Sequence, residues 1–263
     1  MSTPSAPALL LLALSLAGAA RAEQSLYFGE PGGTVEVPGL KLPESATQLT
    51  VELRFKALER LQQPVKLVSR WGDAPNDPDR GTFFVGFNST SQVQPGLRNA
   101  QGGTKTGAGG AWRPGAWHHA AAVWNGDEAV IYLDGKPVMT QKIPDFGPLA
   151  PSALPLVFGP PPEKDRKPAF FEGFVGDIAV WGIARDAAAI AQGMAQPLAG
   201  TEPGLAAFFP LRETAPRATV KDRTAAGLEG RLAESLARAG WCVTPAWNEP
   251  SPDRPYLHLF GYD

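Results

Sequence analysis

The chain has 263 residues, of which 43% are hydrophobic, and a formal net charge of −2 at pH 7. This balance gives no electrostatic basis for binding nucleic acid or an anionic membrane surface. The single cysteine, Cys242, excludes an intrachain disulfide and therefore a small disulfide-stapled scaffold.

The N-terminal segment has the pattern of a secretory signal peptide. Ala8 to Ala17 reads ALLLLALSLA, an apolar run too short to span a bilayer, and Ala20-Arg21-Ala22 offers small residues at a cleavage point. We therefore expect residues 1–22 to be removed and the protein to be secreted, either extracellular or periplasmic. The sequence after residue 22 holds no second apolar run of spanning length, so we expect no membrane-spanning segment.

Ten short apolar or β-branched runs follow, separated by turn residues. In Leu49–Phe55 the apolar residues alternate with Thr50, Glu52 and Arg54, which predicts a strand with one apolar face and one face in water. The ten runs are Leu26–Gly29, Thr34–Val37, Leu49–Phe55, Val65–Trp71, Thr82–Phe87, Trp117–Trp124, Ala129–Leu133, Leu154–Phe158, Phe174–Trp181 and Leu205–Leu211. Many short strands with turns between them predict a sandwich or a barrel.

The stretch from residue 117 to residue 142 carries two adjacent histidines beside several carboxylates. Asp134-Gly135 is a strong signal for a two-residue hairpin turn, because both central positions of a type I′ turn need positive φ. We therefore predict a three-strand meander with the acids at its turns. The only other histidine, His258, lies far along the chain, so His118 and His119 are predicted to be structural, with a metal-binding role as the alternative.

One segment is predicted to be helical. Asp186 is a suitable N-cap, alanines follow it, and Pro197 ends the run, so a short helix is expected near residues 186–196. The glycine-rich stretch 102–110 lacks a phosphate-loop pattern and is predicted to be a flexible hairpin tip. One helix among many strands makes the predicted class all-β.

Five motifs in sequence order resemble the LamG-like jelly roll of the concanavalin A-like lectin/glucanase superfamily, which also contains the pentraxins. They are SLYFGEPGGTVEVPGL, LTVELRFKA, AWHHAAAVWNGDEAVIYLDGKPV, GFVGDIAVWGIARDAAAI and GLAAFFPLRE. The resemblance implies an antiparallel two-sheet sandwich over residues 23–235. Its predicted core includes Trp117, Val123, Ile131, Leu133, Ile178 and Trp181. Residues 236–263, rich in proline and aromatics, are expected to dock on the sandwich, with a partner-binding patch as the alternative.

The resemblance to pentraxins also suggests a calcium site. Asp79 matches an acidic ligand position of that family, and Glu172 matches a position where the family uses an amide or an acid. Glu163 and Asp165 remain where prolines replace most of a second ligand cluster. Oxygen ligands of this kind suit Ca²⁺. Because Arg80 replaces an expected carboxamide, the resemblance leaves a site for a single ion as the alternative, and the favoured interpretation is four solvated loop acids.

For function, the sequence favours recognition over catalysis. Trp71, Trp112 and Trp124 lie at predicted strand ends or loops, where packing in the core or at its rim is favoured and stacking on a sugar ring is the alternative. The E-x-D-x-x-E run of jelly-roll β-glucanases is missing from the sequence. We therefore predict a secreted, non-catalytic module that binds a glycan or an extracellular protein. The alternatives are a structural or assembly protein of the cell envelope and, third, a polysaccharide hydrolase.

Overall fold

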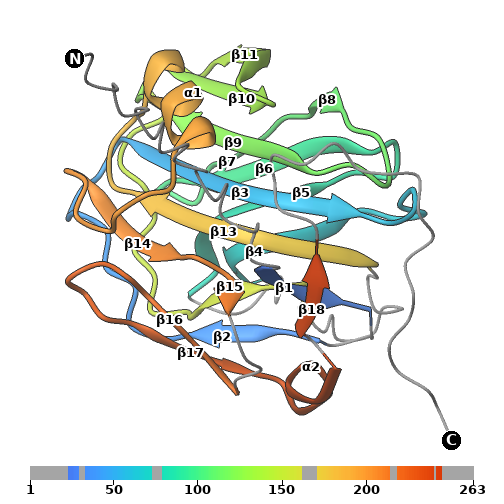
Figure 1. Cartoon of the computed structure of the whole chain (residues 1–263). Helices are drawn as coiled ribbons and strands as arrows, with labels where there is room; N and C mark the ends of the chain where they lie inside the picture. The colour runs from blue at the N-terminus through green and yellow to red at the C-terminus, as the bar shows by residue number, and fades with distance from the viewer. Residues whose placement is uncertain are drawn as a thin grey trace, which may run out of the picture.

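The computed structural model describes residues 23–29, 33–72, 79–161, 171–213, 218–239 and 241–244. Two antiparallel sheets face each other across a hydrophobic core, which confirms the predicted all-β sandwich (Figure 1). Sheet A and sheet B each contain nine strands. Among the described helices, none has the length and apolar composition needed to cross a bilayer.

Sheet A has the strand order β11-β10-β9-β3-β13-β1-β15, with β14 paired to β13 and β18 paired to β1. Its strands are β1 (Glu23–Phe28), β3 (Leu49–Ala57), β9 (His118–Trp124), β10 (Glu128–Leu133), β11 (Lys136–Lys142), β13 (Gly173–Trp181), β14 (Leu205–Phe209), β15 (Arg212–Glu213) and β18 (Trp241–Thr244).

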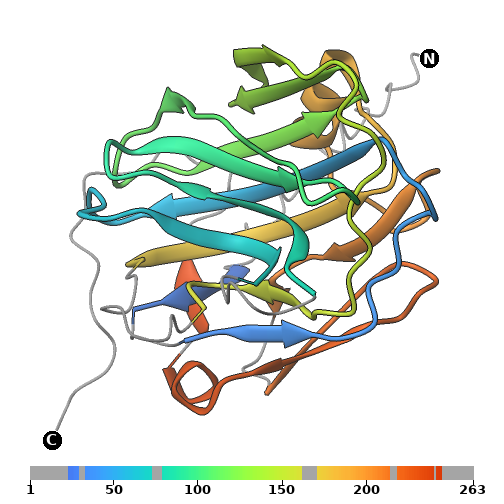
Figure 2. The same cartoon turned by 180° about the vertical axis from the view of Figure 1, so that it is seen from behind.

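Sheet B, seen from behind in Figure 2, has the order β16-β17-β2-β12-β4-β5-β6-β7, with β8 paired to β6. Its strands are β2 (Val35–Val37), β4 (Val65–Trp71), β5 (Gly81–Phe87), β6 (Gln92–Arg98), β7 (Thr104–Thr106), β8 (Gly109–Ala111), β12 (Leu156–Phe158), β16 (Thr219–Lys221) and β17 (Glu229–Leu232). The glycine-rich stretch therefore contains two three-residue strands instead of a simple hairpin tip.

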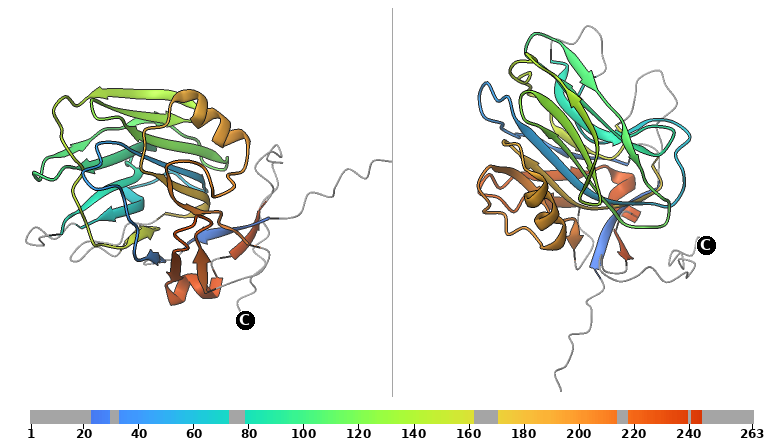
Figure 3. Two further views of the ribbon diagram at one scale, coloured as in Figure 1. Left: turned by 90° about the vertical axis from the view of Figure 1, so that its left-hand side faces the viewer. Right: turned by 90° about the horizontal axis from the view of Figure 1, so that it is seen from above.

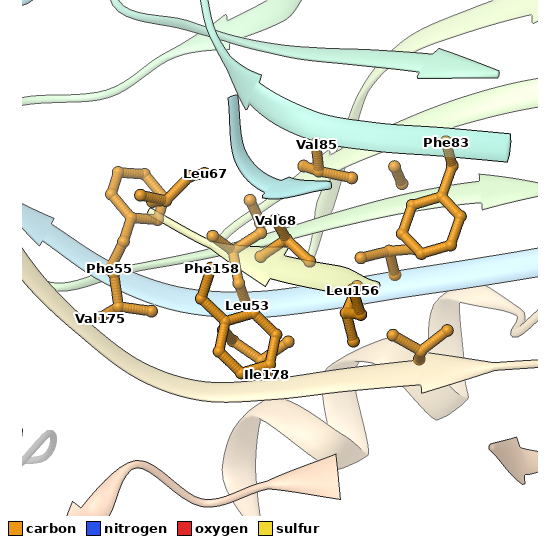
Figure 4. Close-up of a cluster of buried hydrophobic side chains, with 14 of the residues drawn as sticks. Leu53, Phe55, Leu67, Val68, Phe83, Val85, Leu156, Phe158, Val175 and Ile178 are labelled. Carbon is orange, nitrogen blue, oxygen red and sulfur yellow. The ribbon is translucent and has the colours of Figure 1, made fainter. Parts of the chain in front are cut away.

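The core lies between the sheets because alternate residues of each strand point inward (Figure 4). Leu53 and Phe55 of β3 are at most 1% exposed and face the apolar side chains of sheet B. Those partners are Leu67, Val68, Phe83, Val85, Leu156 and Phe158.

Three of the six predicted core residues lie elsewhere. Ile131, Leu133 and Ile178 join the core between the sheets. Val123 and Trp181 are buried, but they belong to two smaller clusters outside it, and Trp117 is partly exposed. The sequence pattern identified them as apolar but could not tell which face of sheet A they occupy.

The predicted meander is present as β9, β10 and β11. Asp134 and Gly135 join the last two strands with φ values of 51° and 74°, the positive values that a type I′ turn requires. The Asp134 carboxylate accepts hydrogen bonds from His118 Nδ1 (2.9 Å) and from the His119 backbone N–H (3.0 Å). His118 therefore stabilises the turn through Asp134, which agrees with the structural role predicted for it.

Replacing Gly135 with alanine is expected to destabilise this turn. A Cβ at a φ of 74° costs about 1 kcal/mol relative to glycine. For a chain of this size that corresponds to a fall of about 2–4 °C in melting temperature. Thermal unfolding by circular dichroism measures it. Gly135→Asn is the control, because it adds the same Cβ but asparagine tolerates positive φ better than alanine, so its loss should be smaller.

The outward face of β3 was predicted to lie in water, and this prediction is wrong. Thr50, Glu52 and Arg54 are 0%, 5% and 7% exposed. Helix α1 (Ala187–Ala195) lies across this part of sheet A and covers it (Figure 3). Asp186 caps the helix by accepting a hydrogen bond from the Ala189 N–H (2.7 Å). The alternation correctly predicted a strand with two different faces. It could not predict that a helix from a distant segment covers the polar face.

The C-terminal part of the described chain adds two elements that the sequence analysis did not predict. Helix α2 (Glu234–Ala239) buries Leu236. Strand β18 then runs antiparallel to β1, with Leu26 opposite Trp241 and Glu23 opposite Thr244. The first residues of the predicted extension therefore lie at the edge of sheet A, and residues 245–263 lie outside the described residues.

Candidate functional site

The outward face of sheet B presents a small aromatic platform. Phe83, Val85 and Phe87 of β5 point into the core, so Phe84 points outward. It lies beside Trp71, the last residue of β4. The two rings meet edge to face, with centroids 5.0 Å apart and an interplanar angle of 84°. Trp71 is partly exposed, whereas Phe84 is 9% exposed.

Arg98 fixes the Trp71 ring. Its guanidinium carbon lies 3.7 Å from the centre of the indole, which is a close cation–π contact. The same guanidinium donates a hydrogen bond to the backbone carbonyl of Arg80, and Arg98 is only 4% exposed. The indole is therefore held on one side by a buried cation that is itself anchored to the backbone.

A glycine shapes the centre of the platform. Gly96 of β6 lies directly opposite Phe84. A Cβ at this position would stand 2.1 Å from Phe84 Cε1, well inside van der Waals contact. The absence of a side chain lets the phenyl ring lie down on the neighbouring strand. Polar side chains on the same outward face of β6 and β7, Gln94 and Thr106, are partly or fully exposed beside it.

The two other tryptophans proposed for sugar stacking are buried. Trp112 is 4% exposed and packs its ring against Phe55 (5.6 Å) and Phe87 (5.2 Å) in the core. Trp124, at the end of β9, is 2% exposed. Neither offers the ring face that the prediction required, because each fills the end of the sandwich between the sheets. Of the three candidates, Trp71 alone is partly exposed.

Asp79 stands next to the platform and is already saturated with hydrogen bonds. Its carboxylate accepts from the backbone N–H groups of Gly81 (3.1 Å), Ala153 (2.5 Å) and Leu154 (3.2 Å). Burial raises its pKa, but the hydrogen bonds from the Ser152 side chain and from these amides outweigh burial and hold the pKa below its usual value. These bonds tie the start of β5 to the segment before β12.

Asp79 should therefore make the fold acid-sensitive. Because its pKa is lower in the folded protein than in the unfolded chain, its contribution to stability is complete above about pH 4 and is lost as the pH falls through the folded value. We expect Asp79→Asn to lower stability at neutral pH and to flatten the loss of stability below pH 4. Urea unfolding at a series of pH values measures both effects. If the unfolding free energy of the variant falls below pH 4 as steeply as that of the unchanged protein, Asp79 does not have this role.

The structure does not bring Asp79 and Glu172 together. Asp79 bonds to Gly81, which begins β5, whereas Phe171, next to Glu172, packs on Phe87 at the other end of that strand (6.1 Å between ring centroids). A strand of this length spans about 20 Å. One calcium ion cannot bind both residues, so the predicted four-residue set is not one site.

Asp79 also does not fit a calcium ligand, since its oxygens already accept four hydrogen bonds. Glu172 accepts from the Tyr27 hydroxyl (3.2 Å). Glu163 and Asp165 lie outside the described residues. Within the described ranges, no cluster of three or more His, Cys, Asp or Glu side chains could hold a metal ion.

A second polar feature, which the sequence analysis missed, lies under α1 on the outward face of sheet A. Glu52 is shared by His119, whose Nε2 is 3.2 Å from the carboxylate, and by Arg185. Arg185 also donates to the Ala189 carbonyl (2.6 Å) and stacks on Trp181 (4.1 Å). A carboxylate that joins β3, β9 and the α1 segment marks this cluster as an anchor for the helix.

Arg54 extends the cluster to the other end of α1. It donates hydrogen bonds to the carbonyls of Gly193 (3.3 Å) and Met194 (2.6 Å), which belong to the last turn of the helix. Its other nitrogen lies 3.8 Å from Asp177. Cationic donors are favourable at a helix C-terminus. The strict alternation in β3 was the available sequence signal, since three polar residues on one face can serve a buried network as well as water.

The family model of the concanavalin A-like lectin/glucanases superfamily matches residues 28–191, which is more than half of the chain. The chain belongs to this superfamily. Its two-sheet sandwich agrees with that assignment. A search of curated proteins finds no relative of this concanavalin A-like chain.

Several solved structures are similar to this concanavalin A-like fold. A candidate carbohydrate-binding protein from Bacteroides ovatus superposes with a TM-score of 0.60 at 15% identity, over 80% of this chain and 58% of that one. The chain thus spans little more than half of that protein. A heptameric pentraxin from Limulus polyphemus gives 0.49 at 19% identity, covering 67% of this chain and 83% of the pentraxin. A sialidase carbohydrate-binding domain from Ruminococcus gnavus gives 0.48 at 16% identity, covering 64% and 97%.

Proposed function

We propose that this protein is a secreted, non-catalytic recognition module that binds a glycan on the outward face of sheet B, at the platform of Trp71 and Phe84. The observation that carries the proposal is the partly exposed Trp71, whose indole is held in place by Arg98. Sugars combine apolar ring faces with hydroxyl groups, so an aromatic surface beside amide and hydroxyl side chains suits them. Gln94 and Thr106 supply those groups next to the rings.

The superfamily assignment and the fold shared with the Bacteroides ovatus protein support a carbohydrate ligand. Because that protein is 15% identical and extends beyond the matched region, its own ligand does not transfer to this chain. The non-catalytic part of the proposal follows from the platform's chemistry. Its described side chains offer stacking and hydrogen bonds, and its one carboxylate, Asp79, is occupied by backbone amides.

A glycan array probed with the purified mature protein tests the proposal. Binding to one or a few related glycans is expected, and it should disappear in Trp71→Ala. An array without any bound glycan, or binding that survives this substitution unchanged, would overturn the proposed site. Incubating each retained polysaccharide with the protein and measuring reducing ends would reveal hydrolysis, which would contradict the non-catalytic part.

Calcium assistance and secretion remain predictions. Residues 1–22, with the expected signal peptide, lie outside the described residues, and so do Glu163 and Asp165. An ion that binds only the native protein raises its melting temperature. We therefore propose to compare melting in 2 mM calcium, a concentration of roughly extracellular order, with melting in a chelator. Identical curves would remove calcium from the proposal.

A further inference from the structure

A small cavity of about 20 Å³ lies between sheet A and α1. Its polar lining comes from Glu52 and Arg54 of β3, His119 of β9 and Asp177 of β13, and Gly193 of α1 closes it. Leu53, Ala179 and Leu198 complete the lining. The cavity therefore sits inside the ionic cluster that anchors the helix, at the point where three neighbouring strands meet α1.

One residue of this lining carries a polar atom without a hydrogen-bond partner in the described chain. His119 is 3% exposed, and its Nδ1 makes no hydrogen bond with any residue of the described chain. Its Nε2 lies 3.2 Å from Glu52 and is assigned as the protonated nitrogen, because a carboxylate accepts a hydrogen bond. Nδ1 is then a buried acceptor. Buried polar atoms are almost always hydrogen-bonded in native proteins, so this one needs a donor.

We infer that the cavity binds one water molecule, which donates a hydrogen bond to His119 Nδ1. A cavity must offer about 10–15 Å³ to hold a water molecule, and this one exceeds that limit while remaining too small for a larger ligand. The lining also supplies the two to four polar partners that a buried water needs. One carboxylate, that of Glu52 or Asp177, accepts its second proton, and Arg54 donates to its oxygen.

The charges around the site favour a neutral occupant. Glu52 and Asp177 are matched by Arg54 and Arg185, which contact them directly. The remaining charged group near His119 is Asp134, which accepts from its backbone N–H on the hairpin side. A neutral water completes the hydrogen bonding of the histidine without adding a buried charge, and it connects the anchor of α1 to the sheet.

The first test is a crystal structure of the protein at about 1.6 Å resolution or better. We expect one ordered water within hydrogen-bonding distance, about 2.7–3.2 Å, of His119 Nδ1. Featureless density in the cavity, or a protein group bonded to Nδ1, would overturn the inference. This test does not depend on the proposed glycan site.

The second test uses two variants of equal size at Ala179, whose side chain borders the cavity. Ala179→Val fills the space and leaves Nδ1 without a donor, so we expect the melting temperature to fall by about 3–8 °C. Ala179→Thr fills the same space but carries a hydroxyl that can donate in place of the water, so its loss should be at most about half as large. Equal losses in the two variants would show that packing alone is responsible and would overturn the inference.

Discussion

Replacing Trp71 with alanine is expected to weaken binding of the glycans that the array identifies by at least tenfold. Truncation of a central tryptophan at a binding surface typically costs about 2 kcal/mol or more, and about 1.4 kcal/mol corresponds to a factor of ten. The effect should be large here because the ring is held by Arg98 and Phe84 before any ligand arrives. Isothermal titration calorimetry with the tightest glycan measures the change.

The matched control is Arg231→Ala, which removes an exposed side chain from β17, several strands away on the same sheet. Its affinity should equal that of the unchanged protein. Arg98→Lys should weaken binding less than Trp71→Ala, since lysine keeps the charge but loses the planar stack. If Trp71→Ala binds normally while remaining folded, the platform is not the ligand site.

The largest stability effect is expected for Glu52→Gln. The substitution leaves Arg185 without its carboxylate partner beneath α1, and breaking a buried ion pair on one side costs about 3–5 kcal/mol. Glu52 is 5% exposed, so solvent screens this interaction little. We expect a fall of roughly 6–20 °C in melting temperature, because each kcal/mol corresponds to about 2–4 °C for a chain of this size.

Glu128→Gln is the matched control for that experiment. Glu128 pairs with Lys142 at 2.6 Å, but the lysine side chain is 77% exposed, so the pair contributes little. Differential scanning calorimetry of both variants gives the loss of melting temperature for the buried pair and for the exposed pair. Equal, small losses would show that Glu52 does not hold the helix. A large loss with an intact β-sheet spectrum would show that the anchor stabilises the fold.

Much of the fold could be predicted because its signals are local. The alternation in Leu49–Phe55 fixed a strand, the Asp134-Gly135 pair fixed a turn, and Asp186 fixed the start of α1. The strand β6 was missed because Pro95 and Gly96 interrupt its apolar pattern. Proline and glycine normally mark turns or sheet edges, yet here the glycine is needed for the contact with Phe84.

The candidate site could be predicted only in part. Trp71 was identified because it ends an apolar run, but the same reasoning selected Trp112 and Trp124, which the second sheet and the strand ends bury. Exposure depends on packing between segments far apart in the chain, as does the placement of Asp79 and Glu172 near opposite ends of β5. The role of Arg98 also had no local signal, because it pairs across strands with a residue 27 positions earlier.

The outermost strand of sheet A, β11, limits how copies of this protein can associate. Pro137 removes one backbone donor from it, a register shift opposite Ile131 and Tyr132 bends it, and Lys136 and Lys142 place charge at its two ends. A β11 strand from a second molecule would meet an irregular edge whose lysines carry the same charge as its own. Raising the concentration of the protein should therefore not convert it into fibrils that grow from this edge of the sheet.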